Sequence, residues 1–477
     1  MIWHVYGCGY MTTLTLDDIL QGTGGELEVL GGGLAPAGVG FSEVTIDSRA
    51  ATGGALFVAL RGERVDGHEF VSGAVANGAR GALVRRNWVA PADLPAGVLL
   101  VRVEDPLAAL QGLAGWWRKR CPAQVIAVTG SIGKTSTKEA LAAVLSRRFN
   151  TLKSAGNLNN EIGLPLTLLR LEPGHEKAVL EMGAGYALGE LTFLCGLAAP
   201  QVAVVTNVGP VHLERMGTIE NIALNKSELV AALPEDGTAV LNGDDARVRA
   251  MGEVTSARKV FYGLGEDNDL RATGIVSNGL KGVDFTLAVG SEGEQWPVHL
   301  PLLGSHSVYT ALAAAGAASA AGMTWREIVE ALEGLSAQVR LVVVPGWNGS
   351  TIIDDAYNAA PDSTIAALDL LAEMPGGKIA VLGDMLELGS YAEEGHLRVG
   401  RRAAHVADRL VAVGRLGRLV GEEAVRAGMA PGSVFFAMEN GQVIDYLKGL
   451  LHAGDHVLVK GSRGLAMDEI VAGLKAE

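Results

Sequence analysis

The segment TGSIGKTS at 129–136 carries residue types that can hold a polyphosphate. It follows the apolar run VIAV at 125–128 and precedes KEALAAVLSRRF at 138–149, which predicts a strand, a glycine-rich loop and a helix in that order. In such a loop, backbone N–H groups bind phosphate oxygens, a lysine reaches the terminal phosphates, and a threonine hydroxyl binds Mg²⁺. The predicted nucleotide contacts are Thr129, Gly130, Ser131, Gly133, Lys134, Thr135 and Ser136, with Lys134 also catalytic.

The loop departs from the general pattern G-x-x-x-x-G-K-[ST], because Val128 stands at the first glycine position. The alternative interpretation is a glycine-rich turn that contains Gly-Lys-Thr by chance. The order of strand, loop and helix favours the phosphate-binding loop.

Two further polar segments follow predicted buried strands. Glu181 begins EMGAG at 181–185, and His212 lies in TNVGPVHLE at 206–214. Ligand sites in parallel α/β sheets lie at the carboxyl ends of strands, and Mg²⁺ prefers oxygen ligands and bound phosphates. The two side chains could therefore complete a Mg²⁺ site. The alternatives are a helix cap or surface acid for Glu181 and an ordinary loop histidine for His212.

A lysine and a group of asparagines are less specific signals. Lys226 lies in the predicted helix ENIALNKSELVAALP at 220–234, where a solvated lysine is the ordinary interpretation. The segment GNLNNEIGLP at 156–165 contains amides that suit the hydroxyl, amide or carboxylate groups of a polar ligand, and a cluster of turn residues is the alternative. The candidate substrate contacts of this segment are Asn157, Asn159 and Asn160.

The last third of the chain also places polar residues after predicted strands. DDAYNAAPDS at 354–363 contributes Asp355 and Asn358, and KGSRGLAMDEI at 460–470 contributes Lys460 and Arg463. A basic loop at a strand end can receive a carboxylate or a phosphate. Two more candidates lie elsewhere: Arg340, which could reach a transferred phosphate, and the motif DSR at 47–49.

Composition limits the class of protein. The 477 residues suggest about three domains by ordinary domain size. The formal net charge of −14 disfavours a general nucleic-acid binder. The three cysteines show no metal-ligand or disulfide spacing, and neither a transmembrane segment nor a signal peptide is recognisable, so we expect a cytoplasmic protein.

The predicted strands and helices alternate along the chain, which indicates an α/β protein. We expect a small α/β domain at 11–110, preceded by an extension at 1–10. A central domain with the phosphate loop and a mainly parallel sheet is expected at 111–335, and a doubly wound, Rossmann-like domain at 336–477.

Taken together, these motifs resemble those of the Mur ligases, a family of ATP-dependent amide-bond ligases. TGSIGKTSTKE, EMGAG and TNVGPVHLE resemble the ATPase core of that family, and DSRAATGGALFVALRGERVDGHEF resembles its UDP-binding domain. SAGNLNNEIGLP, DDAYNAAPDS, VLGDMLELG and VLVKGSRGLAMDEIV resemble the member that adds D-alanyl-D-alanine to UDP-N-acetylmuramoyl-tripeptide through an acyl phosphate, in peptidoglycan precursor synthesis.

The resemblance implies roles for individual residues. Thr135 and Glu181 would hold one Mg²⁺, and His212 would help to hold a second. Lys226 matches a lysine that CO₂ converts to a carbamate, which would make it catalytic and a metal ligand rather than a solvated cation. Arg340 matches a catalytic contact to the γ-phosphate. Asp355 matches a ribose-binding acid, and Ser48 and Arg49 match the pocket for the uridine diphosphate.

One segment departs from the family pattern. In GSHSVYTALAAAG at 304–316, Ser307 stands where the family often has an asparagine near the adenine. A serine reaches less far and lacks the paired amide groups, which puts the adenine contact in doubt but not the reaction.

Other functions remain as alternatives. A relative that adds a diamino acid would be expected to show an arginine-based motif after DDAYN, and none is obvious. A folylpolyglutamate-type ligase would lack the motifs of the first domain, and a non-ligase nucleotide-binding protein would not need Lys226 or the polar loops of the third. The third residue of the tripeptide is undetermined, and a monomer is expected.

Overall fold

The computed structural model describes residues 14–33, 38–62, 64–290, 293–336 and 341–476. The predicted extension at 1–10 lies outside the described residues. Contacts divide the chain into two compact units. The first unit is formed by residues 1–125, 149–182 and 192–200, and the second by residues 126–148, 183–191 and 201–477.

The first unit contains a five-stranded sheet in the order β2-β7-β6-β5-β4, which is parallel except for the pair β2–β7. Its strands are β2 (Glu26–Val29), β4 (Val44–Thr45), β5 (Leu56–Val58), β6 (Gly81–Arg85) and β7 (Leu99–Val103). A short antiparallel pair, β1 (Leu14–Thr15) and β3 (Gly40–Phe41), accompanies it. The helices are α1 (Leu16–Thr23), α2 (Val71–Asn77) and α3 (Pro106–Arg118).

Local sequence explains where two of these helices begin. The hydroxyl of Thr15 accepts from the N–H of Asp18, and the carboxylate of Asp18 accepts from the N–H of Thr15. The two residues form a capping box at the start of α1. Asp105 caps α3, and Pro106 occupies its first turn, where a missing N–H costs no helical hydrogen bond.

The second unit contains a long run of strands in the order β16-β15-β14-β13-β12-β11-β8. It is parallel from β8 to β14 and antiparallel from β14 to β16. These strands are β8 (Gln124–Thr129), β11 (Val202–Val205), β12 (Thr238–Asn242), β13 (Arg258–Gly263), β14 (Leu270–Ser277), β15 (Val283–Val289) and β16 (Gln295–Leu300). The parallel pair β9 (Thr151–Lys153) and β10 (Lys177–Glu181) belongs to the first unit.

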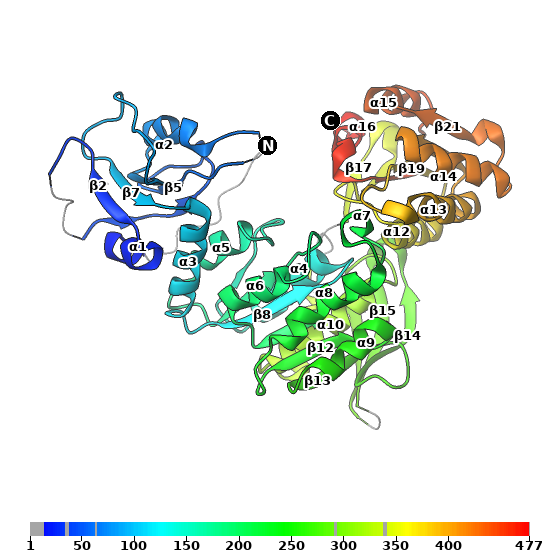
Figure 1. Ribbon diagram of the computed structural model, residues 1–477. Helices are drawn as coiled ribbons and strands as arrows, with labels where there is room; N and C mark the ends of the chain where they lie inside the picture. The colour runs from blue at the N-terminus through cyan, green and yellow to red at the C-terminus, as the bar shows by residue number, and fades with distance from the viewer. Residues whose placement is uncertain (1–13, 34–37, 63, 291–292, 337–340, 477) are drawn as a thin grey trace. The chain divides into compact units, whose positions relative to one another are not determined.

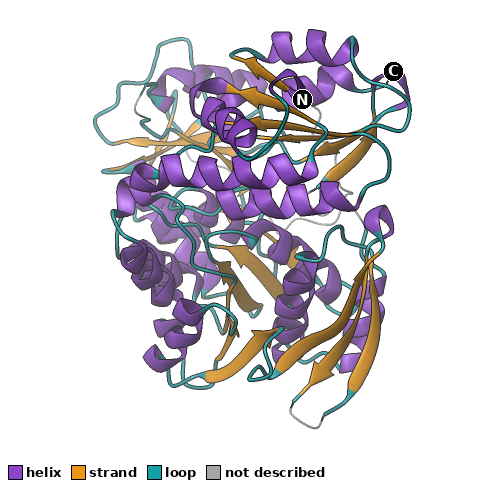
Figure 2. Cartoon of the chain, turned by 90° about the vertical axis from the view of Figure 1, so that its right-hand side faces the viewer, coloured by secondary structure: helices purple, strands orange, loops and turns teal. Residues whose placement is uncertain are grey.

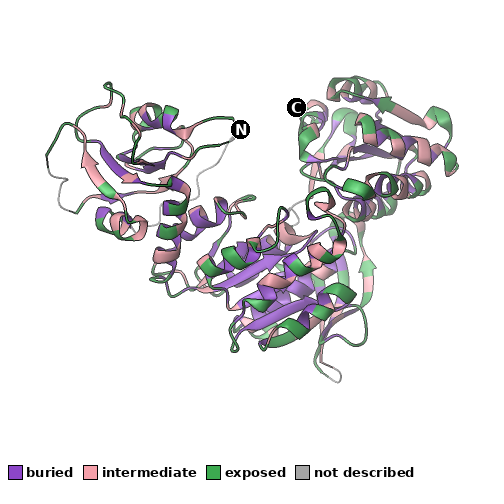
Figure 3. Cartoon of the chain, in the orientation of Figure 1, coloured by how far each residue is buried: buried purple, intermediate pink, exposed green. Residues whose placement is uncertain are grey.

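The inner parallel strands are buried along almost their whole length, as Figure 3 shows for β8 and β12. Helices cover them: α10 (Ser307–Ala320) packs on α4 (Lys134–Leu145), and its Gly316 faces the sheet, where a Cβ would lie 2.9 Å from Val240 of β12. Residues 311–320 thus belong to a packed helix. Among the described residues, no helix is long and apolar enough to cross a membrane.

A six-stranded sheet, also in the second unit, has the order β17-β18-β22-β19-β20-β21 and is parallel except for β17. Its strands are β17 (Val342–Pro345), β18 (Thr351–Asp354), β19 (Lys378–Gly383), β20 (Arg409–Val413), β21 (Val434–Ala437) and β22 (His456–Lys460). Its helices, which Figure 2 shows in purple, include α12 (Pro361–Glu373), α13 (Ala392–Val406), α14 (Gly414–Arg426), α15 (Asn440–Lys448) and α16 (Asp468–Leu474).

Alternate residues of these strands enter two separate hydrophobic cores. Ile353 and Leu458 belong to one core, and their neighbours Ile352 and Val457 belong to the other. A sheet covered on both faces requires strands that are apolar throughout, which is what the sequence shows. The predicted fold class, α/β with mainly parallel sheets and a doubly wound C-terminal part, is confirmed.

Candidate functional site

The predicted phosphate loop connects β8 directly to α4. Gly130 has φ 143°, and a Cβ there would lie 1.9 Å from Oγ1 of Thr206, so only glycine fits. Gly133 has φ 83° and precedes the first residue of α4, Lys134. Thr129 ends β8, Ser131 lies in the loop, and Thr135 and Ser136 lie in the first turn of the helix. The seven predicted nucleotide contacts therefore form one continuous loop at a helix N-terminus.

The carboxyl end of β11 holds this loop in place. The side chain of Asn207 accepts from the N–H of Ile132 at 2.8 Å and donates to its carbonyl oxygen at 3.0 Å. The hydroxyl of Thr206 donates to the same carbonyl oxygen at 2.6 Å. Oγ of Ser131 accepts from the N–H of Gly209 at 2.8 Å. Asn207 thus mimics a strand pairing partner for the loop, a role that sequence reasoning missed although the residue directly follows a predicted strand.

We expect Asn207→Ala to weaken nucleotide binding about tenfold, because it leaves both polar groups of Ile132 without this partner, at a cost of about 1–3 kcal/mol. Isothermal titration with ADP measures the affinity. Asn278→Ala is the matched control, since the Asn278 side chain donates to exposed Asp284, in a separate hairpin. An unchanged ADP affinity in Asn207→Ala would show that the loop keeps its shape without the asparagine.

The ammonium of Lys134 folds back over the loop. Its Nζ donates to the carbonyl oxygen of Gly130 at 2.7 Å and to that of Ser131 at 3.1 Å. A cation held at the loop by these carbonyl oxygens is suited to neutralise a polyphosphate bound there.

Lys226 is buried rather than solvated, contrary to the ordinary interpretation of a helical lysine. It lies in α8 (Ile219–Ala231), and its Nζ donates to the carbonyl oxygen of Ala184 at 2.8 Å and to Oδ1 of Asn225 at 3.1 Å. Burial, and secondly the charge of Lys134, lower the pKa of Lys226 to about 7. A large part of its amine is therefore neutral at neutral pH, which is the nucleophilic form.

His212 adopts the left-handed backbone conformation, with φ 57°, immediately before the short helix α7 (Leu213–Met216). Its Nδ1 lies 2.6 Å from Oε2 of Glu387. Gly185 of the EMGAG segment packs against the ring so closely that a Cβ would lie 2.8 Å from it. Burial is the main cause that lowers the pKa of His212, and the nearby charges of Lys134 and Lys226 lower it further. The structure therefore groups Lys134, His212 and Lys226 within the second unit.

Glu181 lies at the end of β10 in the first unit, where its carboxylate accepts from the side chain of Asn159 at 2.8 Å. Asn160 accepts from the N–H of Gly163, the first residue of α5 (Gly163–Leu168), at 2.9 Å. Asn157 is exposed. Within the described residues, no group of three or more His, Cys, Asp and Glu side chains forms a ready-made metal site. Hydroxyl and carboxylate oxygens fit Mg²⁺ by their chemistry, because a bound phosphate supplies further oxygens.

The predicted residues of the last third of the chain lie together at the carboxyl ends of β18 and β22. Nζ of Lys460 is 2.5 Å from Oδ2 of Asp355 and donates to the carbonyl oxygen of Asn358 at 2.9 Å. The guanidinium of Arg463 lies over the ring of Tyr357, 5.7 Å from its centroid. The charge of Asp355 is thus already paired with a buried lysine. Arg340 lies outside the described residues.

The remaining predicted residues are local features of their loops. Arg49 is exposed and pairs with Asp47 at 2.7 Å, and the carbonyl oxygen of Ser48 accepts from the side chain of Asn77. Ser307 is buried in the first turn of α10, and its hydroxyl donates to the carbonyl oxygen of Leu302 at 3.4 Å.

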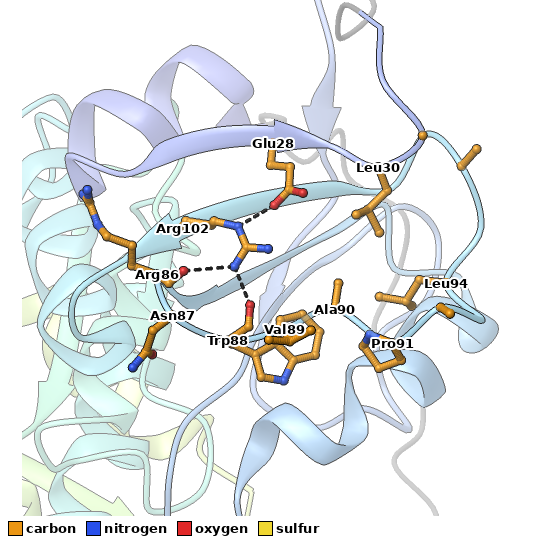
Figure 4. A pocket seen from close by; sticks show the side chains of 13 residues that line it. Glu28, Leu30, Arg86, Asn87, Trp88, Val89, Ala90, Pro91, Leu94 and Arg102 are labelled. Carbon is orange, nitrogen blue, oxygen red and sulfur yellow. Dashed lines mark hydrogen bonds and ion pairs between the residues drawn. The ribbon is translucent and has the colours of Figure 1, made fainter.

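A pocket of about 660 Å³ lies elsewhere in the first unit, beside β2 and β7 (Figure 4). The guanidinium of Arg102 crosses it and donates to Glu28 and to the carbonyl oxygens of Arg86 and Trp88. These hydrogen bonds tie β7 to β2 and to the segment after β6, so the guanidinium has a structural role.

The chain is similar to known proteins over most of its length. Three family profiles match the chain: the catalytic domain of the Mur ligase family at 41–117, the Mur ligase middle domain at 128–318 and the glutamate ligase domain of Mur ligases at 339–463. The UDP-N-acetylmuramoyl-tripeptide–D-alanyl-D-alanine ligase of Escherichia coli is 40% identical over 94% of this chain and 97% of its own length.

Solved structures are similar over the whole chain as well. A crystal structure of MurF from Acinetobacter baumannii has a TM-score of 0.84 and 33% identity, and covers 97% of this chain and 98% of its own. MurF ligase from Thermotoga maritima, solved in complex with ADP, has a TM-score of 0.76 and 30% identity, and covers 90% of this chain and 96% of its own.

Proposed function

Because the chain belongs to the Mur ligase family, we propose that it joins D-alanyl-D-alanine to UDP-N-acetylmuramoyl-tripeptide with the energy of ATP hydrolysis. The enzyme is an ATP-dependent ligase that forms ADP and phosphate, and it serves peptidoglycan precursor synthesis. The observation that carries this proposal is the 40% identity to the Escherichia coli ligase of that name over 97% of its length.

The reaction needs an activated carboxylate. The terminal carboxylate of the tripeptide attacks the γ-phosphorus of ATP, ADP leaves, and an acyl phosphate forms. The amine of D-alanyl-D-alanine then attacks the acyl carbon, loses a proton and expels phosphate. In this scheme the protein forms no covalent bond with the substrates, so catalysis depends on positioning the reactants and on stabilising charge.

The phosphate loop supplies the first part of that work. Lys134 neutralises the β- and γ-phosphates, and the N–H groups around Gly130, Ser131 and Gly133 hold their oxygens. Thr129 and Ser136 complete the binding loop on either side. The loop is held in shape by Asn207 before any nucleotide binds, so its donors need little reorganisation.

By the resemblance to the family, two Mg²⁺ ions would be held by oxygen and nitrogen donors. Thr135 and Glu181 would bind one, and His212 and a carbamate on Lys226 would bind the other; bound there, Mg²⁺ offsets the charge of the transferring phosphoryl group. Carbamylation requires a neutral amine at Lys226, and the lowered pKa of this buried lysine supports it. Nζ forms a bond to the carbon of CO₂ through its lone pair and loses a proton. The product is a carbamate, whose two oxygens resemble those of a carboxylate.

The other substrate contacts are assigned by the same resemblance. Ser48 and Arg49 would contact the uridine diphosphate, and Asp355 the ribose of ATP. The peptide and D-alanyl-D-alanine would be bound by two groups of residues. One group is Asn157, Asn159 and Asn160, and the other is Asn358, Lys460 and Arg463 in the loops of the last sheet. The catalytic contact to the γ-phosphate would come from Arg340. We further propose three domains, at 11–110, 111–335 and 336–477, and a cytoplasmic monomer.

Phosphate release tests the proposed function directly. We expect ATP-dependent release of phosphate with UDP-N-acetylmuramoyl-tripeptide and D-alanyl-D-alanine together, and at most slow release when either is left out. Mass spectrometry should show a UDP-muramoyl pentapeptide. Release that depends on a free diamino acid and UDP-muramoyl dipeptide instead would assign the enzyme to the other branch of the family.

A further inference from the structure

The contact between His212 and Glu387 connects the segment after β11 with the segment after β19. None of the roles assigned above involves Glu387. His212 follows β11, whereas Glu387 lies in the loop between β19 and α13. The two side chains are 175 positions apart, yet Nδ1 and Oε2 are only 2.6 Å apart. Both residues adopt the left-handed conformation, with φ 57° and 63°. Such a conformation is unfavourable for a side chain other than glycine, so two of them on facing residues indicate an imposed geometry.

Two hydrogen bonds and one close backbone approach hold the loop that carries Glu387. The N–H of Met385 donates to Nε2 of His396 at 3.0 Å, and the N–H of Leu386 donates to Oγ of Ser462 at 2.9 Å. On the other side of Glu387, Gly389 approaches α7 so closely that a Cβ would lie 2.8 Å from the backbone nitrogen of Glu214. Hydrogen bonds before Glu387 thus anchor its loop within the last third of the chain, and the close approach of Gly389 to α7 brings this loop next to the segment of His212.

Hydrogen-bond chemistry determines what this contact does to the imidazole. An ionised carboxylate only accepts hydrogen bonds, so the proton between the two groups belongs to Nδ1 of His212. In the neutral ring, Nε2 then carries the free lone pair. Metal-binding histidines commonly donate their other N–H to a carboxylate, which fixes the tautomer and the orientation of the ring.

We propose that Glu387 is a positioning residue of the ligase, which holds His212 in the Nδ1–H tautomer and so keeps Nε2 available to Mg²⁺. The proposal rests on the proposed function for the identity of the metal. Glu387, in the loop between β19 and α13, would then belong to the ATP site. The transfer of the phosphoryl group would therefore depend on this loop.

Manganese binding tests the role without requiring ligation. Electron paramagnetic resonance measures Mn²⁺ affinity in the presence of a non-hydrolysable ATP analogue, and the part lost in His212→Ala defines the histidine-dependent binding. We expect Glu387→Ala to weaken that binding about tenfold or more. Glu387→Gln should stay close to the wild type, because its amide oxygen can still accept from Nδ1–H.

A double-mutant cycle separates positioning from general damage to the structure. Glu387→Ala should have no further effect on Mn²⁺ affinity in the His212→Ala background, because its only route is through the ring. Glu394→Ala is the matched control, since it removes an exposed pair with Arg401 at the start of α13. Nitrogen-15 spectra of the imidazoles should show His212 protonated at Nδ1 in the wild type and a mixture of tautomers in Glu387→Ala.

Three results would overturn the proposal: wild-type Mn²⁺ affinity in Glu387→Ala, an equal loss in the Ala and Gln variants, or an undiminished effect when His212 is absent. The metal and imidazole measurements need no muramoyl substrate. If they come out as expected and phosphate release fails, the proposed function is wrong and the positioning role of Glu387 stands.

Discussion

Lys134→Ala should lose ATP-dependent ligation by about 10³-fold or more while the protein stays folded. The ammonium that now lies 2.7 Å from the carbonyl oxygen of Gly130 is the cation placed to neutralise the β- and γ-phosphates. Without it, the negative charge that develops on the phosphates in the transition state loses the cation of the phosphate loop itself. Phosphate release measures turnover, and circular dichroism with a thermal scan checks the fold.

Lys259→Ala is the control for removing a lysine from this unit. Lys259 lies exposed on β13 and has no role in the proposed site. Its loss should leave turnover unchanged. Near wild-type turnover in Lys134→Ala would refute the role assigned to the phosphate loop.

Lys226→Ala should also lose activity, and short carboxylic acids such as formate or acetate should restore part of it. The substitution leaves a space where a buried side chain reached Ala184 and Asn225. A small carboxylate can enter that space and supply the oxygens that the carbamate would have given to Mg²⁺. Turnover is measured across a concentration series of each acid.

The same acids should not restore Lys134→Ala, because that variant lacks a cation rather than an oxygen ligand. Full activity of Lys226→Ala without added acid would contradict the carbamate. The pH dependence gives an independent measurement. With a pKa lowered to about 7, the amine of Lys226 becomes mostly protonated as the pH falls below 7, and protonated amine does not react with CO₂. CO₂-depleted enzyme should therefore recover with added bicarbonate at pH 8 and recover poorly at pH 6.

The sequence by itself determined the elements whose chemistry is local. The phosphate loop follows from a strand, glycines at two special positions and a helix start within one short segment. The cluster of Asp355, Asn358 and Lys460 was also predictable as a strand-end site, because parallel strands bring their carboxyl ends to the same edge of a sheet. Continuous apolar runs predicted buried parallel strands, since both faces of such a sheet are covered.

Only the tertiary structure decided the contacts that depend on which strands are neighbours. Asn207 reaches Ile132 because β11 lies beside β8, although the two residues are 75 positions apart in the chain. Glu387 reaches His212 because two separate sheets place their loops together. The lysine of α8 shows the same limit, since its helical pattern predicts a solvated side chain whereas packing buries it. Periodicity reports the face of an element on which a residue lies, and only the packing of distant segments determines what covers that face and shifts the pKa of a side chain there.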